Sequence, residues 1–178
     1  MRVISGKYKS RLLDGFKLNK TRATMDRVKE IIFALIGDKV RDKTVIDLFS
    51  GTGSLGIEAL SNGAKFCYFN DSDQEAKKII EKNLNNLAIT NYHLSRLDYK
   101  KALEYYEKEE VSCDILILDP PYKDHIIEEI LVLAEKILHD ESLIVCETEK
   151  SYELNLANYL VFKERIISDK KITILRKR

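Results

Sequence analysis

Four consecutive residues, Asp119-Pro120-Pro121-Tyr122, combine a carboxylate, a stiff backbone and an aromatic ring. They follow an apolar run, residues 115–118, which predicts a buried strand. The two prolines end strand pairing and fix the backbone at that point. Ligands of open α/β sheets bind at the carboxyl ends of the strands. This combination indicates a site that grips the exocyclic amine of a flat base while a methyl group is delivered to it.

The chemistry expected of these residues is positioning. An exocyclic amine is a poor nucleophile because its lone pair is delocalised into the ring. If the Asp119 carboxylate and the Pro120 carbonyl accept its two N–H groups, the lone pair can turn toward a methyl donor, with several kcal/mol of stabilisation and no strong base. Tyr122 would stack on the base, which must be unpaired or flipped out. We therefore predict Asp119, Pro120 and Tyr122 as catalytic and Pro121 as substrate-binding.

A glycine loop precedes this motif in the chain. Residues 47–56, Asp-Leu-Phe-Ser-Gly-Thr-Gly-Ser-Leu-Gly, place G-x-G-x-x-G between an expected strand and an expected helix. Its glycines permit a tight turn and close backbone approach to a ligand. Dinucleotide enzymes share this pattern, and Asp71 lies near the spacing of their ribose-binding acid. Two features favour S-adenosylmethionine: Asp47 could hold an ammonium group, and the loop has no basic residue.

Other acidic residues follow the next two expected strands. Asp71 is placed to accept the ribose hydroxyls, and its competitor Asp73 is equally suited to cap the next helix. Asp98 either accepts from the adenine amine or caps a helix, and the sequence leaves both roles open. The complete set of expected cofactor contacts is Asp47, Phe49, Gly51, Thr52, Gly53, Ser54, Gly56, Asp71, Ser72, Asp98 and Thr24.

Strand and helix patterns alternate along the chain. We expect strands at residues 44–48, 65–70, 92–97, 115–118 and 143–146, helices at 54–61, 73–87, 99–108 and 125–138, and a late antiparallel pair at 160–167 and 171–175. This order predicts an α/β, Rossmann-like fold with a mostly parallel seven-stranded sheet and helices on both faces.

The first 41 residues are expected to form a small basic appendage to a methyltransferase domain at residues 42–178. Residues 2–13 alternate loosely around Gly6, which is typical of a small hairpin. Thr24 is expected to cap a helix that runs to Ile36 and stops at Gly37.

Charge is divided unevenly although the net charge is only +1. Residues 1–41 carry 11 Lys/Arg against 4 Asp/Glu, and residues 160–178 carry 7 against 2, whereas the segment between them is acidic. Basic ends of this kind suggest a docked polyanion, although solvated basic termini are also common. Lys7, Lys9 and Arg11 would be phosphate contacts, which position a nucleic acid without specifying its sequence.

Composition excludes several classes of protein. No apolar stretch approaches the roughly 18 residues of a membrane span, and the apolar part of the N-terminus is too short for a signal peptide. Cys67, Cys113 and Cys146 are too far apart for a zinc knuckle and are expected to be small buried thiols in a reducing compartment. We therefore expect a cytoplasmic monomer without a metal.

Four segments together resemble the RsmD family of class I methyltransferases. They are Ile4-Ser5-Gly6, residues 22–30 (Arg-Ala-Thr-Met-Asp-Arg-Val-Lys-Glu), residues 47–60 and Asp119-Pro120-Pro121-Tyr122. The resemblance runs over nearly the whole chain. It implies methyl transfer from S-adenosylmethionine to N2 of a guanine in bacterial small-subunit ribosomal RNA, free or in an assembling subunit. It also implies that Arg22, Thr24 and Arg27 fold over the cofactor or touch the RNA backbone.

The chain departs from the family's pattern at two places. Ala23 stands where the family usually has proline, which weakens the preorganisation of the helix start. The segment Ile167-Ser168-Asp169-Lys170-Lys171 replaces a Tyr-Gly turn between the last strands, which changes the residues that are available for contacts at that turn. Glu147, at the end of the fifth strand, is interpreted either as a residue near the substrate or as an ordinary solvated strand end.

Other functions share parts of these motifs. Adenine-N6 methylation of DNA uses nearly the same motif, but no extra segment for reading DNA is apparent. Methylation of protein glutamine usually has asparagine before the prolines, and a nicotinamide oxidoreductase leaves Asp119–Tyr122 unexplained. A non-catalytic RNA-binding role in ribosome assembly is disfavoured by the intact Asp119 and glycine loop.

Overall fold

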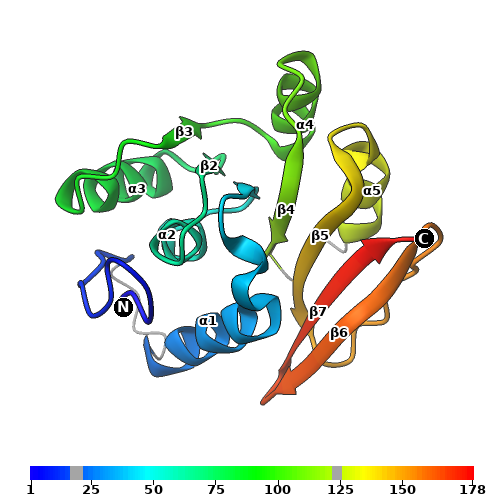
Figure 1. The fold of residues 1–178 in the computed structure, drawn as a ribbon, viewed down its shortest axis with the longest axis horizontal. Helices are drawn as coiled ribbons and strands as arrows, with labels where there is room; N and C mark the ends of the chain where they lie inside the picture. The colour runs from blue at the N-terminus through cyan, green and yellow to red at the C-terminus, as the bar shows by residue number, and fades with distance from the viewer. Residues whose placement is uncertain (17–21, 122–125) are drawn as a thin grey trace.

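The computed structural model describes residues 1–16, 22–121 and 126–178, and only the backbone of residues 22–24. A seven-stranded sheet crosses the molecule in the order β3-β2-β1-β4-β5-β7-β6 (Figure 1). Strands β1 to β5 are mutually parallel, and β7 is antiparallel to both β5 and β6. The predicted mostly parallel sheet with an antiparallel C-terminal pair is confirmed.

The sheet strands follow the predicted sequence with small shifts at their ends. Their bounds are β1 Thr44–Asp47, β2 Phe66–Asn70, β3 Tyr92–Ser95, β4 Cys113–Leu118, β5 Leu138–Glu149, β6 Tyr159–Ile167 and β7 Lys170–Lys177.

Helices cover both faces, as predicted. The helices are α1 Arg22–Ile36, α2 Ser54–Ser61, α3 Gln74–Asn86, α4 Tyr99–Lys108 and α5 Ile127–Leu133, with 3-10 turns at Gly37–Val40 and Ala134–Lys136. Successive strand residues face opposite sides. Val45 therefore packs in a core with residues of α1, α2 and α3, and Ile46 packs in a second core with residues of α4 and α5.

The first residues form an N-terminal arm, defined here as residues 1–14, which lies beside α1, α2 and α3 (Figure 1). Of the predicted hairpin, the structure shows one antiparallel bridge, between Arg2 and Leu12. Val3 and Leu13 are buried in the same core as the helices on that face. Gly6 has a φ of +76°, and a Cβ there would lie 1.9 Å from the Ser61 carbonyl oxygen. The turn at Gly6 therefore also serves close contact with α2.

Two predicted boundaries differ from the structure. Helix α1 begins at Arg22, so Thr24 lies inside it and is not its N-cap; alanine at position 23 is a strong helix former and supports this earlier start. The helix predicted to end at residue 138 ends earlier, and β5 begins at Leu138. The early part of β5 joins β4 through a register shift, where the Ser142 hydroxyl donates to the Cys113 carbonyl oxygen at 2.7 Å.

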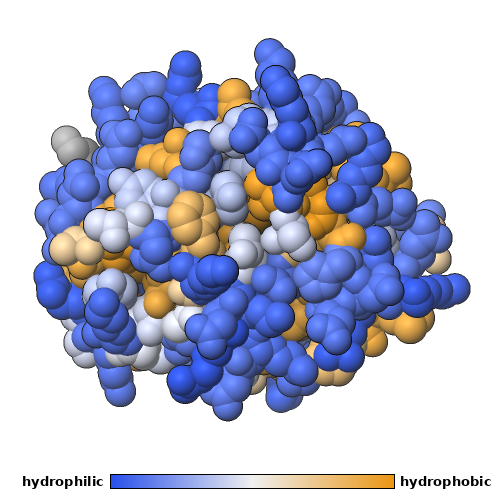
Figure 2. Space-filling view, turned by 45° about the horizontal axis from the view of Figure 1, so that its top comes forward, coloured by the Kyte–Doolittle hydropathy of each residue, from blue (hydrophilic) through white to orange (hydrophobic). Residues whose placement is uncertain are grey.

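The molecular surface is largely hydrophilic, with scattered hydrophobic patches (Figure 2). Within the described ranges, no helix has the length and apolar character needed to cross a membrane. Cys67, Cys113 and Cys146 are buried free thiols, as predicted. Burial is the main cause that raises the pKa of each of these thiols.

Candidate active site at the carboxyl edge of the sheet

Strand register brings three acidic residues to one edge of the sheet. Asp47 of β1 pairs with Ile117 of β4, and Leu118 of β4 pairs with Cys146 of β5. Asp119, which directly follows β4, and Glu147 of β5 are therefore the next residues along two neighbouring parallel strands, whose axes lie about 5 Å apart. Asp119 interacts electrostatically with both Asp47 and Glu147. The glycine loop and the Asp-Pro-Pro motif, 66 residues apart between Gly53 and Asp119, thus share one edge.

Asp47 is a buried carboxylate with one unsatisfied oxygen. Its residue is 1% exposed, and Oδ2 accepts the Gly56 N–H at 2.9 Å. Oδ1 has no hydrogen-bond partner among the described residues. Burial, with a smaller contribution from the Asp71 carboxylate, raises the pKa of Asp47 to about 7. Buried polar atoms are rarely left unpaired, so Oδ1 fits a cationic or hydrogen-bond-donating ligand such as the ammonium group of an amino acid.

Asp119 is half-buried, and Pro120 after it is buried while Pro121 is exposed. Burial is the largest cause that raises the pKa of Asp119, to about 8; the Glu147 carboxylate raises it further, and Lys170 opposes the shift. Strongly perturbed acids in a cleft are typical of functional sites. Tyr122, predicted to stack on the base, lies outside the described residues.

Glu147 is buried, at 3% exposure, so its interpretation as a solvated strand end is wrong. Its carboxylate forms an ion pair with the Lys170 ammonium group. Lys170 begins β7, directly after the turn at which this chain departs from the family pattern. Ser168 in that turn has a φ of +56° and adopts the left-handed conformation that glycine favours.

Asp71 holds the glycine loop against the next helix. Its Oδ2 accepts the Gly51 N–H at 2.8 Å, and its Oδ1 accepts the Asp73 N–H at 2.9 Å. Asp73 caps α3 by accepting the Glu75 N–H at 2.6 Å, which confirms the capping role considered for it.

Asp98 caps α4 in the same way, accepting the Lys100 N–H at 3.0 Å. Of the two roles left open by the sequence, capping is therefore present, and an adenine contact stays a prediction.

The glycines of the loop meet different structural requirements. Gly51 and Gly53 have φ values of +54° and +78°, so the loop needs their left-handed backbone. Gly56 lies in α2, where a Cβ would be 2.3 Å from the Phe69 ring and 2.8 Å from Cys67 Sγ. Helix-to-strand packing explains this glycine, and its N–H is the one that binds Asp47.

The remaining predicted cofactor residues are distributed around the loop. Thr52 and Ser54 are buried, and Ser72 is exposed. Phe49 lies with its ring centroid 6.0 Å from that of Tyr99. The backbone of Thr24 lies in α1, and its side chain is outside the described residues.

Asn70 is a residue that sequence reasoning missed. Its amide nitrogen donates to the carbonyl oxygens of Leu48 and Leu97 at 3.2 and 3.0 Å, and its oxygen accepts the Leu97 N–H at 3.1 Å. It therefore joins the ends of three strands directly behind the glycine loop. The sequence did offer one signal for Asn70: it is a polar residue at the end of an apolar strand, immediately before Asp71.

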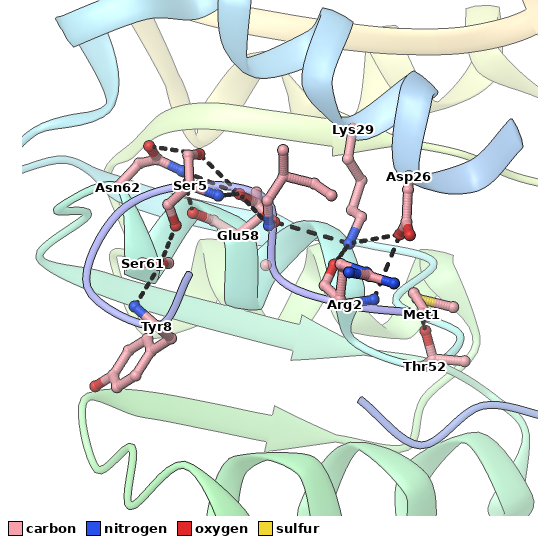
Figure 3. A network of polar contacts seen from close by, with 12 residues as sticks. Met1, Arg2, Ser5, Tyr8, Asp26, Lys29, Thr52, Glu58, Ser61 and Asn62 are labelled. Atoms are coloured by element: carbon pink, nitrogen blue, oxygen red, sulfur yellow. Dashed lines mark hydrogen bonds and ion pairs between the residues drawn. The ribbon is translucent and has the colours of Figure 1, made fainter. Parts of the chain in front are cut away.

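Glu58 and Lys29 were also missed, and together they fasten the N-terminal arm (Figure 3). Glu58 Oε2 accepts the Ile4 N–H at 2.9 Å, and Oε1 accepts the Ser5 N–H at 2.8 Å. The Lys29 ammonium group is 3.7 Å from Glu58 and 3.4 Å from Asp26, and it donates to the Arg2 carbonyl oxygen.

Candidate RNA contacts occupy the arm and α1. Lys7, Lys9 and Arg27 are exposed. Arg11 is also exposed and donates to the Asn86 carbonyl oxygen at 3.2 Å, which ties it to the end of α3. Arg22 begins α1, and its side chain is outside the described residues.

A pocket of about 310 Å³ adjoins the Asp-Pro-Pro motif. It is lined by Pro120, Pro121, Ile126, Ile127, Glu147, Thr148, Glu149 and Tyr152. A larger cleft of about 720 Å³ lies at the opposite edge of the sheet, near Lys43 and Asp114. That cleft contains neither the glycine loop nor the strand-end carboxylates. We therefore take the smaller pocket as the candidate site because of the residues beside it, although its volume is lower.

Comparison with known proteins gives consistent results. The family model described as conserved hypothetical protein 95 matches residues 1–176. Bacillus subtilis YlbH, provisionally named an rRNA methyltransferase, is 40% identical over 157 residues, covering 86% of this chain and 85% of YlbH. Ribosomal RNA small subunit methyltransferase D of Escherichia coli is 30% identical over 170 residues, covering 93% of this chain and 84% of the relative.

A solved Escherichia coli structure, provisionally named methyltransferase YhhF, superposes with a TM-score of 0.86 at 26% identity. The match covers 99% of this chain and 97% of the other. The family match over almost the full length and the shared fold confirm the resemblance inferred from the sequence: the chain belongs to the conserved hypothetical protein 95 family, here called the RsmD family.

Proposed function

We propose that this protein transfers a methyl group from S-adenosylmethionine to the exocyclic N2 of a guanine in small-subunit ribosomal RNA. The observation that carries the proposal is the placement of Asp47 and its glycine loop at the same sheet edge as Asp119 and Pro120. A relative named ribosomal RNA small subunit methyltransferase D, similar over 93% of this chain, supports the choice of RNA.

Residues around the glycine loop would hold the cofactor. Asp47 Oδ1, which has no partner among the described residues, would accept from the ammonium group. Asp71 would accept from the ribose hydroxyls in addition to its bond with the Gly51 N–H. Asp98 would accept from the adenine amine while it caps α4. When bound, S-adenosylmethionine supplies a methyl group on a positively charged sulfur.

Asp119 and Pro120 would orient the nucleophile. The Asp119 carboxylate and the Pro120 carbonyl oxygen accept the two N2–H groups, so the N2 lone pair faces the methyl carbon. N2 would release one proton to solvent after it has accepted the methyl group, so neither residue needs to act as a strong base. Because the acceptors are fixed at a strand end, their contribution is preorganised positioning and electrostatics.

Basic residues of the N-terminal arm and of α1 would position the RNA. Lys7, Lys9 and Arg27 are exposed and would contact phosphates, and Arg11 would do so from the end of α3. We include Arg22 among these proposed phosphate contacts because of its position at the start of α1. We propose that the enzyme works as a cytoplasmic monomer, on free small-subunit RNA or on an assembling subunit.

Labelled methyl transfer tests this function. The protein is incubated with tritiated-methyl S-adenosylmethionine and, separately, with unmodified small-subunit RNA, assembled small subunits and plain DNA, and the labelled nucleoside is identified after digestion. N2-methylguanosine from RNA or subunits is the expected product. N6-methyladenine from DNA, or no labelled nucleoside at all, would contradict the proposal.

A further inference from the structure

Glu147 lies where it could select the base. It occupies the position on β5 beside Asp119, the residue that directly follows β4, because the preceding residues Cys146 and Leu118 are register partners. The pocket beside Pro120 and Pro121 also includes Glu147 in its lining. A base seated against Pro120 would therefore meet acceptors from two neighbouring strands.

The ion pair with Lys170 lowers the free-energy cost of burying the Glu147 carboxylate. An isolated buried charge is costly, and a partner of opposite sign offsets the cost. A carboxylate has about four acceptor positions, so binding one ammonium group is compatible with accepting from a base as well.

The two purines present different edges to a row of acceptors. Guanine offers adjacent donors, N1–H and the N2 amine, whereas adenine offers the N6 amine beside N1, which carries a lone pair. Two carboxylates from neighbouring strands therefore complement guanine and repel N1 of adenine. Sites built to hydrogen-bond a donor strongly disfavour analogues that lack it.

We infer that Glu147 accepts the N1–H of the target guanine and is a specificity-determining residue of this enzyme. Asp119 and Pro120 receive the reacting amine, and Glu147 receives the neighbouring donor. This inference rests on the proposed guanine-N2 methylation and adds to it the residue that distinguishes guanine from other purines.

The sharpest test replaces the target guanine with 2-aminopurine in a synthetic RNA, at the nucleotide identified by the labelling experiment. This base keeps the exocyclic amine at position 2 but has a lone pair in place of N1–H. For the unaltered protein, kcat/KM for guanine should exceed that for 2-aminopurine by roughly 10- to 100-fold.

Glu147→Gln should reduce this preference to within about 5-fold, because the glutamine amide can donate to N1 of 2-aminopurine. Glu141→Gln removes the same charge from an exposed residue of β5 at the opposite edge of the sheet and should leave the preference unchanged. If Glu147→Gln does not fold, the Glu147→Gln/Lys170→Gln double variant removes both charges together and should show the same loss of preference.

The outcomes separate the two proposals. If the unaltered protein methylates guanine N2 but does not prefer it over 2-aminopurine, the role of Glu147 is refuted and the proposed function stands. The same holds if Glu147→Gln slows both substrates equally. If the unaltered protein leaves guanine N2 unmodified, the proposed function fails, and the inference fails with it.

Discussion

Two buried carboxylates, one within α2 and one that accepts a hydrogen bond from it, have opposite surroundings. Glu58, within α2, accepts from the backbone of the arm at Ile4 and Ser5 and lies near the buried Lys29 ammonium group. Asp47, at the end of β1, accepts a single described hydrogen bond, from the Gly56 N–H of α2, and its other oxygen has no described partner. The two residues are equally buried, at 1% exposure each.

We interpret the difference as one between a structural acid, Glu58, and a proposed binding acid, Asp47. Burying a charge is costly unless it is paired and hydrogen-bonded. The fold meets that requirement for Glu58 with its own groups, whereas at Asp47 one oxygen has no partner among the described residues and is the position that we propose for a ligand. Loss of Glu58 should therefore be measured mainly as lost stability, and loss of the acids at the sheet edge mainly as lost binding or activity.

The largest effect is expected for Asp119→Ala. Methyl transfer should fall by about 10³-fold or more, because the reacting amine loses a fixed acceptor. Cofactor affinity by calorimetry should stay within a few-fold, and the urea midpoint should not fall. Asp140→Ala, an exposed acid at the opposite edge, should keep full activity. Full activity in Asp119→Ala would refute the assigned mechanism.

Glu58→Ala should reverse this pattern. It leaves the buried Lys29 without one of its two acidic neighbours and two backbone N–H groups of the arm without their acceptor. Breaking such a pair costs about 3–5 kcal/mol, which urea denaturation would detect. Glu104→Ala, at an exposed position of α4, should change stability by less than about 0.5 kcal/mol. If Glu58→Ala lost little stability, the distinction between Glu58 as a structural acid and Asp47 as a proposed binding acid would be refuted.

Asp47→Asn should weaken binding more than it weakens the fold. The ammonium group of S-adenosylmethionine loses its charged acceptor, and calorimetry should show an affinity decrease of about 10- to 100-fold. The free energy of unfolding at pH 8 should not fall as it does in Glu58→Ala, because no ion pair is broken. Unchanged affinity would exclude Asp47 as a cofactor ligand.

The sheet-edge acids should also give stability a pH dependence. The folded-state pKa values of Asp47 and Asp119, about 7 and about 8, lie above their ordinary value of 3.8. Between about pH 4 and pH 8 the folded state retains protons that the unfolded state releases, so this contribution to stability declines as pH rises. Urea denaturation at pH 5 and pH 8 should show a smaller decline for Asp47→Asn/Asp119→Asn than for the unaltered protein. An equal decline would show that these acids titrate normally.

The smallest effect is expected for the exposed lysines of the arm. Lys7→Glu/Lys9→Glu should weaken RNA binding several-fold and lower the slope of log affinity against log salt by about 1–2. Lys108→Glu, at the far end of α4, should leave the slope unchanged. Point changes are preferable to truncation because Val3 and Leu13 are part of the core. An unaltered slope would exclude the arm as an RNA contact.

The sheet and the site location were accessible from the sequence. The alternation of strand and helix patterns predicted an α/β fold with a mostly parallel sheet, and the rule that ligands bind at carboxyl strand ends placed Asp47 and Asp119 at one edge. These signals are local, or they depend on a general property of parallel sheets. The same reasoning identified Asp73 and Asp98 as possible caps.

What the sequence did not reveal depends on partners distant in the chain. The polar start of β5 resembles a loop, and its pairing with β4 becomes evident only in three dimensions. Burial of Glu147 depends on Lys170, and burial of Lys29 depends on Glu58 and the arm. Periodicity reports which face a residue occupies within its own element, but not which residue of another element lies opposite.

The attachment of the arm has a consequence for biosynthesis. Gly6 fits against Ser61, and the Asp14 N–H donates to Asn83 at 2.8 Å. The arm precedes both contact elements in the chain, so it has no docking surface until α2 and α3 have been translated. At about 5–20 residues per second, the nascent arm waits for several seconds with Val3 and Leu13 exposed. A segment that is translated early thus reaches its native place only after two later helices have formed.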